Sequence, residues 1–348
     1  MLVSVIIPIY NEKNTIQSTL ESFINQKGII KDDYEIIVVD GNSTDDSVSL
    51  IKELIEENNF IKLIKNDKRF MPYGFNIGLS NSSGKYVMVA SGHCLVEENY
   101  LRNAISLIKE KEVECVSGVM TTVQDNNIGK IISVAQSTFF GVGNAAFRIN
   151  LDNGTYVDTG VFGFYISDIF KKVGGMDEEL IRNQDEEFNF RLIQNNGRIW
   201  LDPKLKSKYY SRSSFLKLFI QYFQYGFFKI RVMQKRINFI SMRHLIPLAF
   251  ILALLGSSVY VLKFNRLLPL ILLFVSYASA SIFFTIKQIV ITKNLKLHYY
   301  LLPFAYAMMH FGYGIGSLLG FFYYIHKWKD KDIIDKHFNR SQFVKNRL

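Results

Sequence analysis

The sequence predicts an α/β protein in which a mostly parallel sheet, with helices on both faces, is followed by an α-helical transmembrane region. Two observations lead to this fold class. In the N-terminal part, Val/Ile-rich runs alternate with segments of helical periodicity, which is typical of a parallel sheet covered on both faces. Between Pro203 and Lys329 there is no Asp or Glu, although Lys and Arg continue and most of the long apolar runs lie there.

The N-terminal elements follow from their periodicity. Val3–Ile9 is a continuous β-branched run that indicates a buried strand, whereas Asn11–Gln26 has apolar residues at the i, i+4, i+7 and i+8 positions of a helix. Further strands are expected at Glu35–Val39, Phe60–Ile64, Lys85–Ala90, Val116–Val119 and Arg198–Leu201. Further helices are expected at Thr44–Asn58, Pro72–Ser82 and Gln184–Gln194. These elements place residues 1–210 in one cytosolic domain.

A membrane region is predicted beyond this domain. Residues 211–243 form a basic juxtamembrane segment, in which Phe215–Phe228 mixes aromatic and basic residues as a helix lying in the membrane interface does. Residues 244–326 hold three apolar segments, and residues 327–348 form a basic tail. The apolar segments are Leu245–Leu262, Leu267–Ile286 and Tyr299–Ile325. A helix that crosses a bilayer needs roughly 20 such residues.

The charge distribution bears on location. A net charge of +10, with basic residues flanking apolar runs, favours membrane lipid over nucleic acid as the partner. The N-terminus lacks the pattern of a secretory signal, so a multi-pass protein of the cell membrane with a cytosolic first domain is expected. Basic residues at both ends of the membrane region place both ends in the cytosol, which three crossings cannot do. Either Tyr299–Ile325 is a re-entrant pair broken near Gly312, or the tail does not control orientation; we favour three crossings.

Polar residues follow four consecutive expected strands. They are Pro8–Glu12, Asp40–Asp46, Asn66–Phe70 and Ser91-Gly92-His93. Ligands of open α/β sheets bind beyond the carboxyl ends of the strands, so these residues should gather at one edge. Neither GxGxxG nor GxxxxGK[ST] is present, which disfavours a Rossmann dinucleotide site and a P-loop. A turn and a helix N-cap explain Asn42–Asp46, whereas Asp40 ends an apolar strand and needs a partner.

Several segments together resemble the inverting family 2 glycosyltransferases of the GT-A fold. The openings "VSVIIPIYNEKNTI" and "EIIVVDGNSTDDS" carry this resemblance, which continues through "FNIGLSNSSGKYVMVAS", "FKKVGGMDEEL" and "RNQDEEFNFRL". It covers roughly Val3 to Asp202. The likeness is closer to the membrane-anchored, succinoglycan-type exopolysaccharide branch, through "GVGNAAFR", "YVDTGVFGFY" and "QYFQYGFFKIRV" followed by apolar segments.

The resemblance implies a function and a set of site residues. It implies a membrane-bound enzyme that moves a sugar from a nucleotide-sugar, a UDP-sugar, to a lipid-linked saccharide with inversion, in exopolysaccharide or cell-surface glycan synthesis. By the resemblance, the donor-binding residues are Pro8, Tyr10 and Glu12 at the base and ribose, Asp40 at the uracil, Arg69 near the nucleotide or its phosphates, and Ser91 and His93 at the outer positions of the family's Asp-x-Asp. Asp185 would be the general base, with Glu186 on the acceptor side.

This chemistry needs such a set. A departing nucleoside diphosphate gains charge, which a divalent cation usually neutralises. The incoming hydroxyl needs a carboxylate to take its proton. Asp185, followed by Glu186 and Glu187, opens the helix expected at Gln184–Gln194. The alternative is that these acids only favour the positive end of the helix dipole.

The divalent cation, Mn²⁺ or Mg²⁺, depends on Ser91 and His93, because the family's residues there are normally acidic. Serine is a poor ligand, whereas imidazole suits Mn²⁺ better than Mg²⁺, so His93 is the expected metal ligand. Two alternatives stay open. Arg69, Arg148 and Arg212 would neutralise the leaving group directly, or His93 would only be hydrogen-bonded in a turn.

Other functions fit parts of the sequence. A processive synthase would carry Gln-x-x-Arg-Trp, of which "QNNGRIW" is a loose echo. A polyprenyl-phosphate sugar synthase also combines this domain with membrane spans. A catalytically degenerate binding or scaffold protein would explain Ser91 but not the retained Asp40 and Asp185. A transporter would show more ionisable residues in its spans than His310.

The acceptor is expected at the membrane surface. The acid-free segment Lys204–Arg243 would lie at the cytosolic leaflet, where a polyprenyl-diphosphate-linked saccharide offers phosphates. We predict that Lys229 and Arg231 bind this diphosphate. Plain attraction to anionic headgroups is the alternative.

Overall fold

The computed structural model describes residues 1–123, 126–143, 152–210, 214–236, 242–292 and 297–329. This part of the chain separates into two compact units. The first contains Met1–Thr122 and Ala146–Tyr210, and the second contains Val123–Ala145 and Ser211–Lys331. The segment Val123–Ala145, which was expected in the 1–210 domain, thus belongs with the C-terminal helices.

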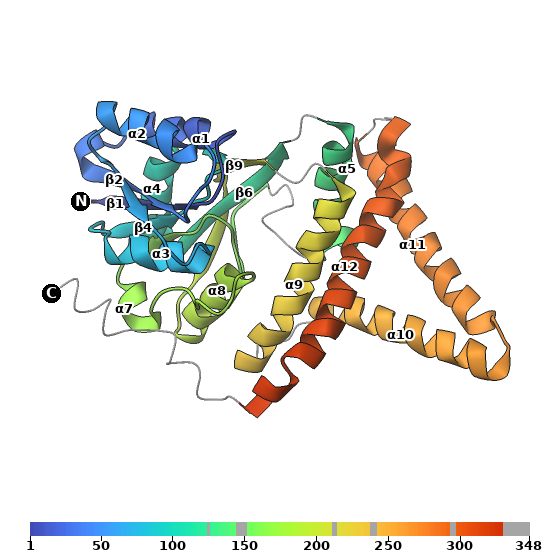
Figure 1. Ribbon diagram of the computed structural model, residues 1–348. Coiled ribbons are helices and arrows are strands. Elements are labelled where there is room, and N and C mark those ends of the chain that lie inside the picture. Colours follow the sequence, from blue (N-terminus) through green and yellow to red (C-terminus); the bar gives the residue numbers. More distant parts are fainter. Residues whose placement is uncertain (124–125, 144–151, 211–213, 237–241, 293–296, 330–348) are drawn as a thin grey trace. The chain divides into compact units, whose positions relative to one another are not determined.

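The first unit is a sheet with helices on both faces (Figure 1). Its strands are β1 Val3–Ile9, β2 Tyr34–Asp40, β3 Ile61–Lys65, β4 Tyr86–Val89, β5 Cys94–Val96, β6 Cys115–Val123, β7 Thr155–Tyr156, β8 Phe164–Ile166 and β9 Ile199–Tyr210. Its helices are α1 Ile16–Ile24, α2 Ser47–Glu57, α3 Met71–Ser80, α4 Tyr100–Lys111, α7 Ile169–Val173 and α8 Gln184–Gln194, with a short 3-10 helix at Lys31–Asp33.

The sheet is mixed. Among the described residues its order is β3-β2-β1-β4-β8-β6-β9-β5, with β7 paired to β9. The β3-β2-β1-β4 half is parallel, whereas β8 runs antiparallel to β4 and β6, and β5 and β7 run antiparallel to β9. The predicted α/β class is confirmed, and the parallel character holds for the half that contains β1 to β4.

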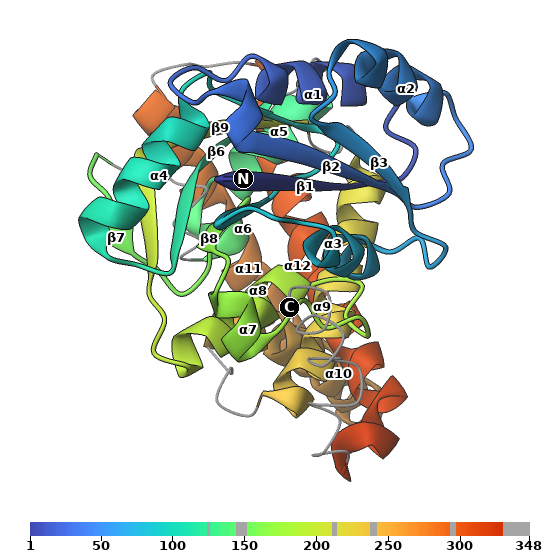
Figure 2. The same ribbon diagram turned by 90° about the vertical axis from the view of Figure 1, so that its left-hand side faces the viewer.

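Alternating side chains bury both faces of the parallel half. On β1, Val5 and Ile7 pack with α1 residues such as Leu20, whereas Ile6 packs with Phe75 of α3. Figure 2 shows α1 and α2 on one side of these strands and α3 on the other. This double burial explains the continuous apolar runs of the sequence.

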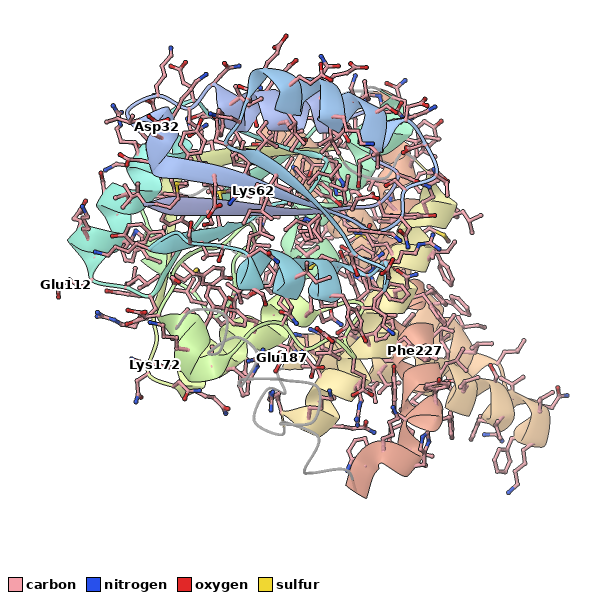
Figure 3. All side chains as sticks on the ribbon, turned by 60° about the vertical axis from the view of Figure 1, so that its left-hand side comes forward. Asp32, Lys62, Glu112, Lys172, Glu187 and Phe227 are labelled. Carbon is pink, nitrogen blue, oxygen red and sulfur yellow. The ribbon has the colours of Figure 1, made fainter. Side chains whose placement is uncertain are left out.

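The amino ends of the parallel strands are tied together by Glu35, which is fully buried. Its carboxylate accepts hydrogen bonds from Ser4 Oγ at 2.6 Å and from Lys62 Nζ at 2.7 Å. The backbone N–H and the hydroxyl of Ser83 also donate to it, each at 2.8 Å. Lys62, labelled in Figure 3, lies on β3, so one carboxylate links β1, β2, β3 and the approach to β4.

Two expected boundaries were wrong for a physical reason. The helix expected from Asn11 begins at Ile16, and the helix expected from Thr44 begins at Ser47. The residues before each helix use their polar groups to bind the other loop, as the next subsection shows. By contrast, β1 and α8 have the predicted bounds.

The second unit is helical. Its elements are α5 Asn127–Gln136, α6 Phe139–Val142, α9 Phe215–Lys235, α10 Met242–Phe264, α11 Leu268–Thr292 and α12 Leu302–Tyr323, with short 3-10 helices at Leu297–Leu301 and Ile325–Lys329. By length and composition, two described helices are apolar enough to cross a membrane, His244–Phe264 and Leu268–Ile291, and α12, in the third predicted segment, is not one of them. Few of their residues are buried, 6% and 11% of the most apolar window.

Helices α9 and α12 lie side by side (Figure 1). A Cβ atom on Gly312, Gly316 or Gly320 would collide with a backbone carbonyl of α9. The carbonyls belong to Phe219, Phe223 and Phe227, of which Phe227 is labelled in Figure 3. Glycine at every fourth position thus lets the two backbones touch. Because α12 runs unbroken through Gly312, the alternative of a re-entrant pair broken there was wrong.

Candidate functional site

The loops after β1 and β2 interlock at the carboxyl edge of the sheet. The Asn11 N–H donates to Ser43 Oγ at 2.9 Å, and the Thr44 N–H donates to Asn11 Oδ1 at 2.8 Å. The Glu12 N–H donates to Ser47 Oγ at 2.8 Å. The first two predicted polar segments are therefore in direct contact, and these hydrogen bonds occupy the residues that were expected to begin the helices.

Asp40 has a structural partner. It is 8% exposed, and its carboxylate accepts the Ser43 N–H at 3.2 Å, which closes the turn after β2. Gly41 passes so close to the next loop that a Cβ there would lie 2.6 Å from the Arg69 carbonyl oxygen. The turn thus explains the buried acid, and its predicted contact with the base stays a prediction.

Arg69 and Tyr10 form a stacked pair. The Arg69 guanidinium carbon lies 3.8 Å from the centroid of the Tyr10 ring, within cation–π range. Arg69 has a left-handed backbone, with φ of 67°. The Asn66 side chain supports this loop, because its Oδ1 accepts the Lys68 N–H at 3.0 Å and its Nδ2 donates to the Phe70 carbonyl at 3.1 Å. Two predicted donor-binding residues therefore meet, from loops after β1 and β3.

Pro8, another predicted donor-binding residue, lies near the end of β1 and against α3. A Cβ on Gly74 of α3 would be 3.0 Å from Pro8 Cβ. Pro8 is therefore packed between the sheet and this helix, and its predicted contact with the nucleotide stays a prediction.

Glu12 and His93 form a second pair at this edge. Glu12 Oε1 lies 2.7 Å from His93 Nδ1. Glu12 Oε2 lies 3.2 Å from Thr15 Oγ1, so both carboxylate oxygens have polar neighbours. On its other side the imidazole packs edge-on against the Tyr209 ring, with centroids 4.9 Å apart. His93 is therefore held from β1, β4 and β9.

Two threonines, Thr15 just before α1 and Thr19 within it, fix the turn that carries His93. The hydroxyls of Thr15 and Thr19 lie 2.8 and 3.1 Å from the Gly92 carbonyl oxygen, which accepts from them. A Cβ on Gly92 would be 2.8 Å from Glu12 Cγ and 2.9 Å from Ile9 Cγ2, so glycine lets Glu12 pass beneath the turn. Sequence reasoning missed both threonines, because 77 and 73 residues separate them from Gly92 and no local pattern marks the contact.

The Ser91 hydroxyl is turned away from solvent. Its Oγ is buried and lies beside the Cys94 thiol. Burial raises the pKa of the neighbouring Cys94 thiol to about 12, an effect that the Ser91 backbone and hydroxyl partly offset. A buried neutral hydroxyl beside a thiol is a weak metal ligand, which leaves His93 as the better donor of the two.

A divalent cation fits this edge if the diphosphate supplies most of its ligands. In the described ranges, no group of three His, Cys, Asp or Glu side chains gathers that would hold an ion alone. The Nε2 atom of His93 makes no hydrogen bond with described residues, and 26% of the side chain is exposed. A carboxylate on the opposite ring nitrogen is the usual partner of a metal-binding histidine. Arg148 and Arg212, the alternative cationic groups, lie outside the described residues.

Asp185 lies in the first turn of α8, near the loop of Arg69. Gln184 Nε2, at the start of α8, donates to Met71 Sδ at 3.3 Å, and Met71 begins α3 two positions after Arg69. Asp185 Oδ1 accepts the N–H of Glu186 at 2.9 Å. Both acids are partly exposed. The start of α8 thus lies beside the loop of Arg69, and the role of Asp185 as the base stays a prediction.

The third acid of this turn, Glu187, is structural. It is fully buried and labelled in Figure 3. Its oxygens accept from Arg191 Nε at 2.7 Å and Arg191 Nη2 at 3.0 Å. The same guanidinium donates to the carbonyls of Val173 and Gly175, so the pair fastens α8 to the end of α7. Glu187 is therefore a structural acid, whereas the role of Asp185 stays a prediction.

Lys229 and Arg231 are buried in the second unit, with 3% and 0% exposure. Arg231 Nη1 donates to Gln234 Oε1 at 3.2 Å and to the Lys327 carbonyl at 3.4 Å. Its guanidinium carbon also lies 5.9 Å from the Tyr324 ring centroid. Arg231 thus links the end of α9 to the chain after α12, and contact of either residue with an acceptor stays a prediction.

Comparison with known proteins identifies relatives over most of the chain. Residues 4–174 match the family model described as "Glycosyl transferase family 2". A Methanococcus voltae protein named "Dolichyl N-acetyl-alpha-D-glucosaminyl phosphate 3-beta-D-2,3-diacetamido-2,3-dideoxy-beta-D-glucuronosyltransferase" is 33% identical over 73% of this chain and 80% of its own. The "Succinoglycan biosynthesis protein ExoA" of Rhizobium meliloti is 24% identical over 76% of this chain and 80% of its own.

A solved structure shares the fold. The mannosyltransferase PcManGT from Pyrobaculum calidifontis, in complex with GDP-Man and Mn²⁺, superposes with a TM-score of 0.63 and 17% sequence identity. The match covers 91% of this chain and 86% of that chain. The likeness supports the GT-A-like fold predicted from the sequence.

Proposed function

Because this chain belongs to glycosyl transferase family 2 and is a glycosyltransferase, we propose that it moves a sugar from a UDP-sugar to a lipid-linked saccharide at a membrane, with inversion. One observation carries the proposal. The loops after β1, β2, β3 and β4 meet at the carboxyl edge of four parallel strands, where α/β sheets bind ligands.

In this proposal the donor lies over that edge. Tyr10, stacked on Arg69, would contact the nucleoside, with Pro8 beside it. Asp40 would accept a hydrogen bond from the uracil ring. Among the described residues, its carboxylate oxygens receive only the Ser43 N–H, and a carboxylate has further lone pairs that can accept. Arg69 would lie near the phosphates, where a fixed positive charge favours a diphosphate.

The transfer step requires a base opposite the leaving group. Asp185 would take the proton of the acceptor hydroxyl while that oxygen attacks the anomeric carbon and the nucleoside diphosphate departs. His93 Nε2, with diphosphate oxygens and water, would hold a divalent cation. Such a cation neutralises charge on the departing diphosphate when it is bound. Glu186, next to Asp185 and partly exposed, would contact the acceptor.

The acceptor is proposed to be a polyprenyl-linked saccharide. The names of the Methanococcus voltae and Rhizobium meliloti relatives concern a dolichyl-phosphate-linked sugar and succinoglycan biosynthesis, which supports a lipid-linked or polysaccharide acceptor. The apolar side chains of α10 and α11 are largely exposed, as expected of helices facing lipid. We place the first unit in the cytosol. The predicted contact of Lys229 and Arg231 with the acceptor diphosphate would require both buried side chains to become exposed.

The donor reaction tests this proposal. Purified full-length protein with Mn²⁺ should release UDP from at least one sugar in a panel of UDP-sugars. Asp185→Asn should abolish release and leave UDP binding unchanged. Bound UDP without hydrolysis of any donor in the panel, even with lipid extract present, would identify a binding protein instead. No binding of UDP at all would overturn the UDP-sugar assignment.

A further inference from the structure

The contact between Glu12 and His93 has no place in the donor-binding roles that the resemblance implies. Glu12 was expected at the base and ribose, yet one of its oxygens lies 2.7 Å from His93 Nδ1 and the other lies 3.2 Å from Thr15 Oγ1. Its backbone N–H is also bound, to Ser47 Oγ. A carboxylate held in this way faces an imidazole rather than open space.

The chemistry of the contact determines the tautomer of His93. An ionised carboxylate can only accept hydrogen bonds, so Nδ1 must carry the proton. In a neutral imidazole the lone pair is then on Nε2, the atom that makes no hydrogen bond with the described part of the chain. The contact thus presents a metal-binding nitrogen in one fixed orientation.

The surroundings hold this geometry from several sides. The Thr15 and Thr19 hydroxyls fix the Gly92 carbonyl, and the Tyr209 ring packs against the imidazole edge. A glycine at position 92 gives the Glu12 side chain room beneath the turn, since a Cβ would lie 2.8 Å from Glu12 Cγ. Each of these features keeps Glu12 and His93 together.

We infer that Glu12 is a positioning residue, which fixes the orientation and tautomer of His93 so that Nε2 receives the divalent cation bound to the donor diphosphate. This inference rests on the proposed function for the cation, and it replaces direct contact of Glu12 with the nucleotide. It also bears on Ser91, because a site with one protein ligand depends strongly on how that ligand is held. Carboxylate partners of metal-binding histidines typically contribute about 10- to 100-fold in metal affinity.

The first measurement is Mn²⁺ binding, by electron paramagnetic resonance of free Mn²⁺ at a fixed saturating concentration of UDP. Full-length protein in detergent is used. Glu12→Ala should lower Mn²⁺ affinity by about 10- to 100-fold, and Glu12→Gln, which keeps an acceptor, should lower it less. His93→Ala, which removes the ligand itself, should lower Mn²⁺ affinity at least as much as Glu12→Ala, and the double variant should lose no more than His93→Ala, because Glu12 acts only through His93. Glu21→Gln on exposed α1 surface is the matched control.

The second measurement needs neither metal nor nucleotide. ¹⁵N–¹H NMR of the imidazole at fixed pH should show His93 protonated on Nδ1 in the wild type and shifted toward Nε2 in Glu12→Ala. His93→Asn identifies the signal. A purely structural role for Glu12 would lower thermal stability without moving this tautomer.

Different failures have different meanings. If Glu12→Ala weakens UDP binding in EDTA and leaves Mn²⁺ affinity intact, Glu12 contacts the nucleotide and the inference is overturned. A wild type that binds UDP but holds no Mn²⁺ overturns both the inference and the cation of the proposed mechanism. A wild type that binds no UDP overturns the proposed donor, and the tautomer measurement still decides whether Glu12 positions His93.

Discussion

Replacing Glu187 should destabilise the first unit, whereas replacing Asp185 two positions earlier should stop catalysis. The two acids have the same chemistry and share one helical turn. Glu187 is fully buried against Arg191, which is 8% exposed, whereas Asp185 is partly exposed at the start of α8. Glu187→Gln keeps the shape of the side chain and removes its charge.

The magnitude follows from what Glu187→Gln leaves behind. The Arg191 guanidinium would stay buried without a counter-charge, although it would keep its bonds to the carbonyls of Val173 and Gly175. Removing one partner of a buried ion pair costs about 3–5 kcal/mol. For a domain of roughly 150–250 residues, 1 kcal/mol shifts Tm by about 2–4 °C, so Tm should fall by about 6–20 °C. Asp185→Asn removes a charge from a helix N-terminus, which costs about 0.3–1 kcal/mol.

Thermal unfolding and UDP release are measured on the same full-length preparations. We expect Glu187→Gln to lower Tm and to retain turnover below its new Tm, and Asp185→Asn to change Tm little and to lose turnover. Equal Tm values for the two variants would show that the pair with Arg191 does not stabilise the unit. An Asp185→Asn enzyme with wild-type turnover would remove Asp185 from the mechanism.

Three further changes test other parts of the structure. Gly92→Ala should cost about 1–3 kcal/mol of stability through overpacking and weaken Mn²⁺ binding, because the methyl group would lie 2.8 Å from Glu12 Cγ; unchanged Mn²⁺ affinity would contradict the close approach. Arg69→Lys keeps the charge but loses the planar stack on Tyr10, so UDP affinity by calorimetry should fall about two- to thirtyfold, and an unaltered affinity argues against the stack. For Glu35, burial acts to raise the pKa, but the hydrogen bonds it accepts outweigh this and lower the pKa below 4.5. Its stabilisation is therefore present above about pH 4.5 and lost as pH falls through the lowered pKa, so Glu35→Gln should flatten the acid limb of a Tm-against-pH curve, and an identical limb would count against the linkage.

Local pattern predicted the parallel half of the sheet and the edge where its polar loops meet. β1 and α8 have the predicted bounds because an apolar run and an amphipathic period define them directly. The starts of α1 and α2 were misplaced, because Asn11 and Thr44 bind each other's loop and cannot be helical at the same time. Local propensity cannot predict such a contact, because the two residues are 33 positions apart in the sequence.

For the same reason, some residues of the site could be recognised from the sequence and others could not. Asp40 and His93 stood out in the sequence because polar groups ending apolar runs need partners. Glu12 was assigned to the nucleotide by resemblance, and its contact with His93, 81 positions away, had no local signature. One signal was present and unused: Glu187 and Arg191 have the i, i+4 spacing of a helical ion pair, which marks the third acid as structural.

Ser91 is the residue whose role the structure changes most. The resemblance expects a carboxylate at this position, and serine there removes one negative charge from the diphosphate edge. A cation held by His93 alone would then be bound mainly by the diphosphate, so it would enter and leave with the nucleotide. Two consequences follow from this arrangement. Metal affinity should be weak without UDP and rise when UDP is bound, and Ser91→Asp should raise affinity in the absence of nucleotide. Ser91 Oγ is buried beside Cys94. Ser91→Asp can therefore raise Mn²⁺ affinity only if the new carboxylate turns away from Cys94 and reaches the ion. A Ser91→Asp variant that folds normally and binds Mn²⁺ no better without UDP would show that the turn at Gly92 keeps position 91 facing inward.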